Sequence, residues 1–240
     1  MSIEDEVEAI LAGRYEIKEL DWIPAKHEAS LENVAYKINA VAFAIDMRDS
    51  SSLLDDHRRE TAAKLYRAFL KVVAHYVHGY GGTIRFFGGD GALAFWPGAT
   101  QDSARKAVDC ALRLNHSLRA EIAGQLAKSQ LVDFGIGIAA SDVLVVKAGT
   151  DQAKHSSDLV FVGECVNLSV KLSKSVGGGK PIGITRVIHD CLAVDRQYAD
   201  PDALWLKEPY WEEGEVRVGN NEYAVMVLDY EGSGLHLTDG

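Results

Sequence analysis

The order in which strand-like and helix-like segments follow one another limits this chain to few folds. The stretch Ala35–Met47 has the apolar pattern of a β-strand, whereas His57–Val77 places apolar side chains three or four residues apart, as an amphipathic helix does. Two short apolar runs follow, Thr83–Phe87 and Ala92–Trp96, on either side of the glycine-rich turn Gly88–Gly91. They predict a β-hairpin directly after the first of these helices.

The next segments continue this alternation. A second amphipathic helix is predicted over Asp102–Leu118, and two strands are predicted over Asp133–Ala139 and Val143–Lys147. A shorter strand at Leu159–Val162 and a helix from Glu164 to the glycines at 177–179 come after them. The order β-α-β-β-α-β-β, followed by β-α, predicts an α+β fold, a ferredoxin-like or palm-like sandwich with a mostly antiparallel sheet and helices.

The chain divides into one main domain and two short ends. Residues 1–30 are predicted to be a helical lead-in, because Glu4–Leu11 has one apolar side and Gly13 ends the helix. Residues 31–230 form the main domain, which ends in a β-rich segment around Tyr223–Leu228. Residues 231–240, with three glycines and few apolar side chains, are expected to be a flexible tail.

Composition excludes several classes of protein. The chain has 240 residues, of which 47% are hydrophobic, and no apolar run approaches the roughly 20 residues of a membrane helix. The net charge of −10 does not favour binding to nucleic acid or to an anionic membrane. The acidic first residues are unlike a signal peptide, and three cysteines without CxxC spacing argue against disulfides and zinc sites. We therefore expect a cytoplasmic protein.

Two carboxylates stand where a side chain is exposed rather than packed. Asp46 comes at the end of the first long strand, and Asp90 comes 44 residues later on the turn of the hairpin. In a β-α-β-β unit the first strand lies beside the hairpin, so the two side chains can meet and hold Mg²⁺ together with a phosphate group. The spacing alone favours the simpler interpretation that Asp90 is an ordinary Asp-Gly turn residue.

Asn167 and Lys171 are four residues apart on a predicted helix and therefore share one face. An amide and an ammonium side by side can hold a ribose and a phosphate, although a solvated helix face is the more common reason for such a pair. The glycine-rich stretches match neither the Walker nor the Rossmann pattern, and the chain has no HExxH or GxSxG motif. Cys165 is better explained as a small buried residue than as a nucleophile.

Five segments in order resemble the catalytic domain of class III nucleotide cyclases, the adenylate and guanylate cyclase family. They extend over about residues 36 to 228. The segments are Val41–Leu53, Ile84–Phe95, Phe134–Gly149, Phe161–Leu172 and Pro181–Thr185.

The resemblance assigns roles to the residues found above. Asp46 and Asp90 match the two metal-binding aspartates, with the backbone carbonyl of Met47 as an additional ligand, which implies two Mg²⁺ or Mn²⁺ ions per site. Asn167 matches the asparagine that orients the ribose. Lys171 stands where most of the family has an arginine that steadies the transition-state phosphate, so the positive charge is kept but the bidentate fork is lost.

The positions that read the base depart from the purine cyclases. Phe86 and Val160 stand where those enzymes have a lysine and an acidic or hydroxyl residue, and neither side chain can form a hydrogen bond with a purine. With Lys171 and the motifs around both aspartates, the chain looks most like the pyrimidine cyclases of bacterial antiphage (Pycsar) systems. Arg85, next to the lost lysine position, or Arg48 could donate to either pyrimidine, and the resemblance alone implies UTP over CTP.

The protein implied by this resemblance is a homodimer with shared active sites. It makes a 3′,5′-cyclic monophosphate and pyrophosphate, and a separate effector protein senses the cyclic nucleotide. Two alternatives remain open: an adenylate or guanylate cyclase, and a catalytically silent cyclase-homology domain that binds nucleotide and has a regulatory role. The presence of both aspartates and Asn167 favours an enzyme, whereas Lys171 keeps the silent domain possible.

Overall fold

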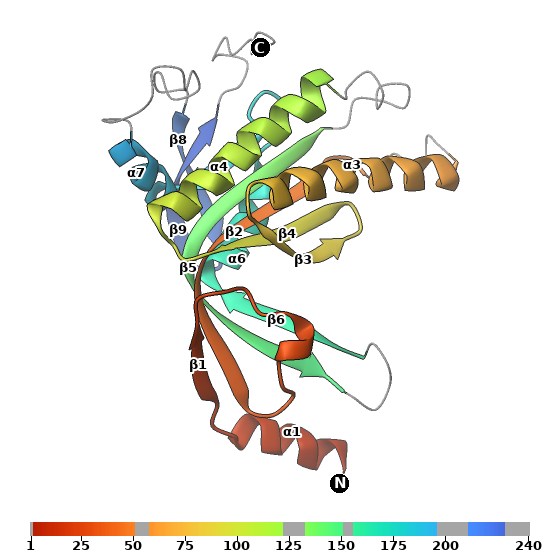
Figure 1. The fold of residues 1–240 in the computed structure, drawn as a ribbon, viewed down its shortest axis with the longest axis vertical. Helices are drawn as coiled ribbons and strands as arrows, with labels where there is room; N and C mark the ends of the chain where they lie inside the picture. Colours follow the sequence, from red (N-terminus) through yellow and green to blue (C-terminus); the bar gives the residue numbers. More distant parts are fainter. Residues whose placement is uncertain (1, 51–57, 122–132, 151–155, 196–210, 229–240) are drawn as a thin grey trace.

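The computed structural model describes residues 2–50, 58–121, 133–150, 156–195 and 211–228. Within these ranges nine strands form one mixed sheet with helices packed against it (Figure 1). The helices are α1 (Ile3–Ala12), α3 (Arg59–Gly79), α4 (Gln101–His116), α6 (Glu164–Ser175) and α7 (Arg186–Asp195), with short helical turns η1 (Lys26–Glu28) and η2 (Ser117–Glu121). The strands are β1 (Glu16–Leu20), β2 (Val34–Met47), β3 (Thr83–Gly88), β4 (Gly91–Pro97), β5 (Phe134–Gly149), β6 (Ser157–Gly163), β7 (Ile182–Thr185), β8 (Trp211–Val218) and β9 (Asn221–Leu228).

The centre of the sheet has the predicted ferredoxin-like arrangement. Strands β3, β4, β2 and β5 lie side by side in that order, and each pairing is antiparallel. Among the described strands, the β1–β2 and β5–β7 pairs are parallel. β5 is one strand of 16 residues where the sequence predicted two, because it stays paired with β2 through the expected break. The α+β fold class is confirmed.

Alternating side chains of the long strands belong to two different hydrophobic clusters. The larger cluster contains Phe43 and packs against α3, α4 and α7, while the second contains Ala42 and packs against α6. Gly137 on β5 lets α6 approach the sheet closely, because a Cβ at this position would lie 2.1 Å from the carbonyl oxygen of Ser169. Any larger residue at Gly137 would push away the helix that carries Asn167.

Several elements were not predicted from the sequence. The helix expected over Glu4–Leu11 is present as α1, but β1 follows it inside the stretch predicted as a helical lead-in and pairs with β2. The five residues of β1 are mostly charged and largely exposed, so they carry little of the apolar pattern that marks a strand. Strands β7 and β8 and helix α7 were also missed. The predicted tail, 231–240, lies outside the described residues.

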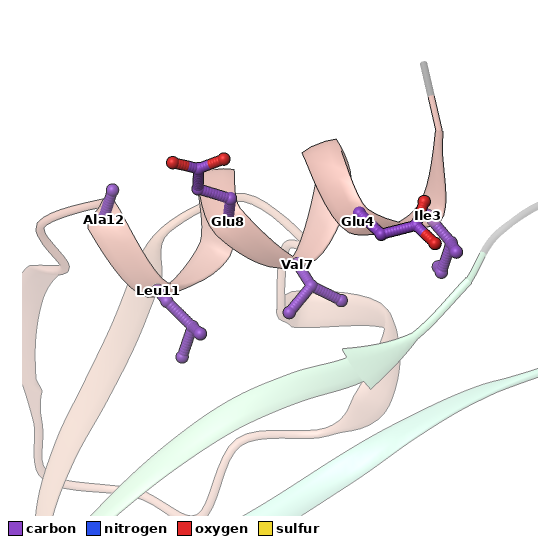
Figure 2. A pocket seen from close by; sticks show the side chains of 6 residues that line it. All are labelled: Ile3, Glu4, Val7, Glu8, Leu11 and Ala12. Atoms are coloured by element: carbon purple, nitrogen blue, oxygen red, sulfur yellow. The ribbon is translucent and has the colours of Figure 1, made fainter.

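Part of the sheet extends beyond the helices as an arm (Figure 1). It consists of the N-terminal half of β2 and the C-terminal half of β5, together with β1, β6 and α1. No residue of α1 is buried, and Ile3, Val7 and Leu11 line a shallow cavity of about 570 Å³ (Figure 2). No helix in the described part of the chain is long and apolar enough to cross a membrane.

Candidate active site

The structure brings Asp46 and Asp90 together at one end of the sheet. Asp46, near the end of β2, lies opposite Gly91, the first residue of β4. The backbone N–H of Met47 donates a hydrogen bond of 3.3 Å to the carbonyl oxygen of Asp90. The strand and the hairpin turn thus hold the two aspartates side by side, as expected from the β-α-β-β order.

The hairpin leaves room for these carboxylates because residue 91 is a glycine. A Cβ at Gly91 would lie 3.1 Å from Oδ1 of Asp46 and 2.7 Å from the carbonyl oxygen of Ile45. Since real side chains do not approach a backbone oxygen so closely, any other residue here would displace the strand or the carboxylate. The glycine therefore serves the site as well as the turn.

The electrostatics of the pair suit a divalent cation. Partial burial and the negative charge of Asp90 raise the pKa of Asp46, while the positive charges of Lys174 and Arg48 act in the opposite direction. Two carboxylates that repel each other are stabilised by a cation between them, and their oxygen atoms are ligands that Mg²⁺ accepts. The described residues contain no group of three or more His, Cys, Asp or Glu side chains placed to hold a metal ion. Phosphate oxygens, water and a backbone carbonyl such as that of Met47 would complete the coordination.

Two residues that the sequence analysis did not single out hold Asp90 in place. The hydroxyl of Ser50 donates to Oδ2 of Asp90. The carbonyl oxygen of Ser50 in turn accepts a hydrogen bond of 2.8 Å from the hydroxyl of Tyr66 on α3. The serine-rich stretch after Asp46 is a signal that could have pointed to Ser50. Tyr66 gives no such signal, because it looks like any aromatic residue on the inner side of an amphipathic helix.

Asn167 and Lys171 lie together on the exposed face of α6, one turn apart, as predicted. Lys174 continues this face by almost one further turn. The helix rises about 1.5 Å per residue, so Asn167 lies roughly 10 Å along the axis from Lys174, whose charge acts on Asp46. No hydrogen bond or ion pair joins Asn167 or Lys171 to the two aspartates within the described part of one chain.

The guanidinium of Arg48, a predicted pyrimidine donor, points to the end of α6. It donates to the carbonyl oxygens of Ser173 at 2.9 Å and Lys174 at 2.5 Å, and also to that of Val176. To donate to a base, Arg48 would have to leave these three acceptors. Its role as a base reader stays a prediction, and the structure offers it a second role at α6.

Arg85 also has a backbone partner. It occupies an irregular position in β3, where the pairing with β4 shifts, and its Nη2 donates to the carbonyl oxygen of Ile23 at 2.6 Å. Burial lowers the pKa of this guanidinium, and its Nε is buried without a hydrogen bond. A buried donor without an acceptor is costly, so Arg85 keeps an unused capacity to donate.

The two apolar positions predicted to face the base are both exposed. Phe86 is 58% exposed and pairs with Leu93, while Val160 is 43% exposed and pairs with Val146. The neighbour of Val160, Phe161, turns inward and stacks on Phe95 at a centroid distance of 4.6 Å. Phe86 shares the side of the sheet of its pairing partner Leu93. Leu93 and Phe161 pack against the same cluster, so Phe86 lies on the side of Phe161 and not on that of Val160. The structure of one chain does not bring Phe86 and Val160 together.

Comparison with known proteins gives relatives that cover most of the chain. It is 27% identical over 208 residues to a uridylate cyclase of Burkholderia cepacia, a match covering 84% of this chain and 87% of the relative. It is 26% identical over 205 residues to a uridylate cyclase of Rhodovulum sp. (strain MB263), covering 79% of this chain and 82% of the relative. No family profile matches the chain.

Solved structures of nucleotide cyclases share the fold. The guanylyl cyclase Cya2 superposes with a TM-score of 0.66 at 23% identity and covers 80% of this chain and 92% of its own. The adenylyl cyclase CyaB from P. aeruginosa superposes with a TM-score of 0.65 at 18% identity and covers 81% of this chain and 95% of its own. These findings confirm the resemblance to the class III nucleotide cyclases that the sequence predicted.

Proposed function

The chain has the class III cyclase fold and resembles uridylate cyclases over most of its length, and from this premise we propose that it converts UTP to 3′,5′-cyclic UMP and pyrophosphate. The observation that carries the proposal is the pair Asp46 and Asp90, fixed side by side in a chain whose relatives are named uridylate cyclase. In the reaction the ribose 3′-oxygen attacks the α-phosphorus. The bond between that phosphorus and the oxygen of the leaving pyrophosphate breaks, and the 3′-hydroxyl proton passes to water.

The carboxylates of one chain supply the metal half of this site. Asp46, Asp90 and the carbonyl oxygen of Met47 would hold two Mg²⁺ or Mn²⁺ ions, which when bound lower the pKa of the 3′-hydroxyl and neutralise phosphate charge. The chain's own contribution is to fix the two carboxylates before the nucleotide arrives. Ser50 keeps the Asp90 carboxylate oriented through its hydroxyl, so little reorganisation is needed during the reaction.

A second copy of the chain would supply the other half. Asn167 would orient the ribose and Lys171 would donate to the α-phosphate as its charge develops. Both side chains are exposed, which is what residues that serve a partner's site require. A twofold dimer in which each α6 faces the partner's carboxylates would complete two equivalent sites.

The preference for a pyrimidine is proposed from Phe86 and Val160 taken separately, because one chain does not bring them together and each removes a polar partner of a purine. A purine in a pocket without polar partners would leave ring nitrogens unpaired, at a cost of about 1–3 kcal/mol each. Arg85 stays the predicted donor to uracil or cytosine oxygen atoms, but its Nε is buried and its Nη2 donates to Ile23, so its side chain would have to move to reach a base. Because one arginine donor suits both pyrimidines, the choice of UTP over CTP depends on the relatives' names alone.

The biological setting of the proposal is antiphage defence. Cyclic UMP would be made in the cytoplasm as a second messenger for a separate effector protein that senses it. This part of the proposal follows from the resemblance to the Pycsar enzymes. It can be tested by expressing the protein in bacteria with and without its neighbouring genes and measuring phage infection.

The activity itself is tested by incubating the purified protein with ATP, GTP, CTP or UTP at equal concentration, with Mn²⁺ or Mg²⁺, and separating the products. We expect cyclic UMP to form fastest. Faster turnover of ATP or GTP would replace the proposal with a purine cyclase, and faster turnover of CTP would change only the preferred pyrimidine. Nucleotide binding without turnover of any triphosphate would support a silent cyclase-homology domain.

A further inference from the structure

Lys174, at the end of α6, is near enough to Asp46 of its own chain for its charge to act on that carboxylate, and it has no part in the mechanism above. We propose that Lys174 binds the phosphate groups of the nucleotide held at Asp46 and Asp90 of the same chain, and that Arg48 is the positioning residue that keeps it there. This proposal rests on the proposed function, because it requires a metal-bound triphosphate at the two aspartates.

The backbone places the last turn of α6 directly against the strand residue next to Asp46. Gly135 on β5 lies opposite Asp46 in the strand pairing. A Cβ at Gly135 would lie 2.1 Å from the carbonyl oxygen of Ser173, the residue before Lys174. Gly135 therefore allows a contact between helix and strand that a side chain would prevent, and this contact brings Lys174 to the metal half of its own chain.

Arg48 fixes this arrangement from the other side. It follows Asp46 by two residues, and its guanidinium donates to the carbonyl oxygens of Ser173, Lys174 and Val176. The last carbonyl oxygens of a helix have no partner within the helix, so an arginine that binds them ties down the final turn. The same short segment thus carries a metal-binding carboxylate and clamps the end of α6.

The ammonium of Lys174 is available for a ligand. The side chain is exposed, and its ammonium makes no hydrogen bond or ion pair with the described residues. Its positive charge acts on Asp46 and offsets part of the rise in pKa that burial and Asp90 cause there. Arg48 acts on Asp46 in the same way, but its N–H groups are occupied by carbonyl oxygens.

A phosphate group is the ligand that this position fits. A metal-bound triphosphate beside two aspartates has a net negative charge, and an ammonium on a flexible stem can reach any of its oxygen atoms. The simpler explanation for Lys174 is that a positive charge near the C-terminus of a helix stabilises the helix. The two explanations differ in what is lost with the side chain: phosphate affinity in the first, thermal stability in the second.

The experiment measures binding of inorganic pyrophosphate with Mn²⁺ by calorimetry, together with UTP kinetics and melting temperature. We expect Lys174→Ala to weaken pyrophosphate binding and raise the KM for UTP about tenfold, as loss of one charged hydrogen bond does, with kcat changed less. Lys174→Arg should restore most of the affinity. Lys71→Ala, which removes an exposed lysine from α3, is the matched control and should bind pyrophosphate like the wild type.

The role of Arg48 is tested with Arg48→Lys alone and combined with Lys174→Ala. If Arg48 acts through Lys174, Arg48→Lys weakens pyrophosphate binding when Lys174 is present and adds no further loss when it is absent. Unchanged pyrophosphate affinity in Lys174→Ala, with only a lower melting temperature, would overturn this proposal and leave the cyclase function intact. A wild-type protein that neither binds pyrophosphate nor turns over UTP would overturn both.

Discussion

The carboxylate turn and the exposed face of α6 differ in how completely one chain prepares them. Asp46 and Asp90 are partly buried and are held by strand pairing, by the backbone bond from Met47 and by the hydroxyl of Ser50. Asn167 and Lys171 stand on rigid helical backbone, but their side chains are exposed. The metal half of the proposed site is therefore preorganised within one chain, while the half that we propose to meet the ribose and α-phosphate would come from a second copy.

The largest effect is expected from removing either carboxylate. Asp46→Ala or Asp90→Ala should lower turnover to below about 1% of the wild-type rate, because the metal ions lose a ligand at the reacting phosphate. The fold should persist, since neither carboxylate belongs to a hydrophobic cluster. Initial rates with Mn²⁺ and the circular dichroism spectrum check both statements.

The matched control for these variants is Asp102→Ala. Asp102 is an exposed aspartate at the start of α4, beyond the end of β4 opposite to Gly91, and it pairs with Lys106 and Arg105. Its replacement should leave turnover unchanged. If Asp46→Ala or Asp90→Ala kept more than a few per cent of the wild-type rate, the two aspartates would not be the metal ligands.

The next largest effect tests whether the two halves meet between chains. Asp46→Ala and Lys171→Ala should each be inactive, but an equal mixture should regain activity, because one site of each heterodimer combines an intact Asp46 with an intact Lys171. Random exchange of subunits predicts about a quarter of the wild-type activity. Exchange is verified with two affinity tags, and verified exchange without recovery would show that each chain builds its site alone.

The metal half could be predicted from sequence because local patterns mark both of its aspartates. A strand that ends in Asp46 and a glycine-lined turn around Asp90 are both visible in the chain, and the β-α-β-β order implies that they meet. The supporting residues could not be predicted in this way. Tyr66 reaches Ser50 only because α3 packs across the sheet, and Arg48 reaches α6 only because Gly135 lets the helix approach.

Strand β1 of the arm could not be predicted from the sequence either. β1 joins the sheet by parallel pairing with β2, although its own five residues are mostly charged and exposed. Its strand conformation is stabilised by backbone hydrogen bonds to β2, and such pairing leaves no period of apolar residues in the sequence. Edge strands of this kind become visible only when the partner strand is known.

A smaller effect is expected from a variant that weakens the contacts holding Asp90 but keeps both aspartates as metal ligands. Tyr66→Phe deletes the hydroxyl that binds the carbonyl oxygen of Ser50. The loss of one hydrogen bond, about 1 kcal/mol, should raise the Mn²⁺ concentration needed for half-maximal rate about fivefold. The rate at saturating Mn²⁺ should change much less, because the ligands themselves remain. Tyr15→Phe, at an exposed position near β1, serves as the control. An unchanged metal requirement would mean that Ser50 holds Asp90 without help from Tyr66.

The smallest effect concerns the thermal stability of the metal-free protein, which the negative charge of Asp46 lowers. Partial burial and repulsion by Asp90 raise the pKa of Asp46, so its charged form is unfavourable in the folded, metal-free protein. This cost is full above the raised pKa and disappears as the pH falls toward the ordinary value of 3.8, because protonation removes the charge. Metal-free Asp46→Asn should therefore melt about 1–3 °C above the wild type at neutral pH, with no difference in strong acid.

Adding Mn²⁺ should raise the melting temperature of the wild type above that of Asp46→Asn, since only the wild type keeps both carboxylates and gains stability by binding the metal.

Asp102→Asn is the control for which we expect a change of melting temperature in the opposite direction. The hydrogen bond from Lys106 lowers the pKa of Asp102, so its charged form is favourable and its neutralisation should lower the melting temperature at neutral pH. If metal-free Asp46→Asn also melted below the wild type at neutral pH, Asp46 would be stabilising its own chain like Asp102. The contrast between Asp46, with its raised pKa, and Asp102, with its lowered pKa, would then be wrong.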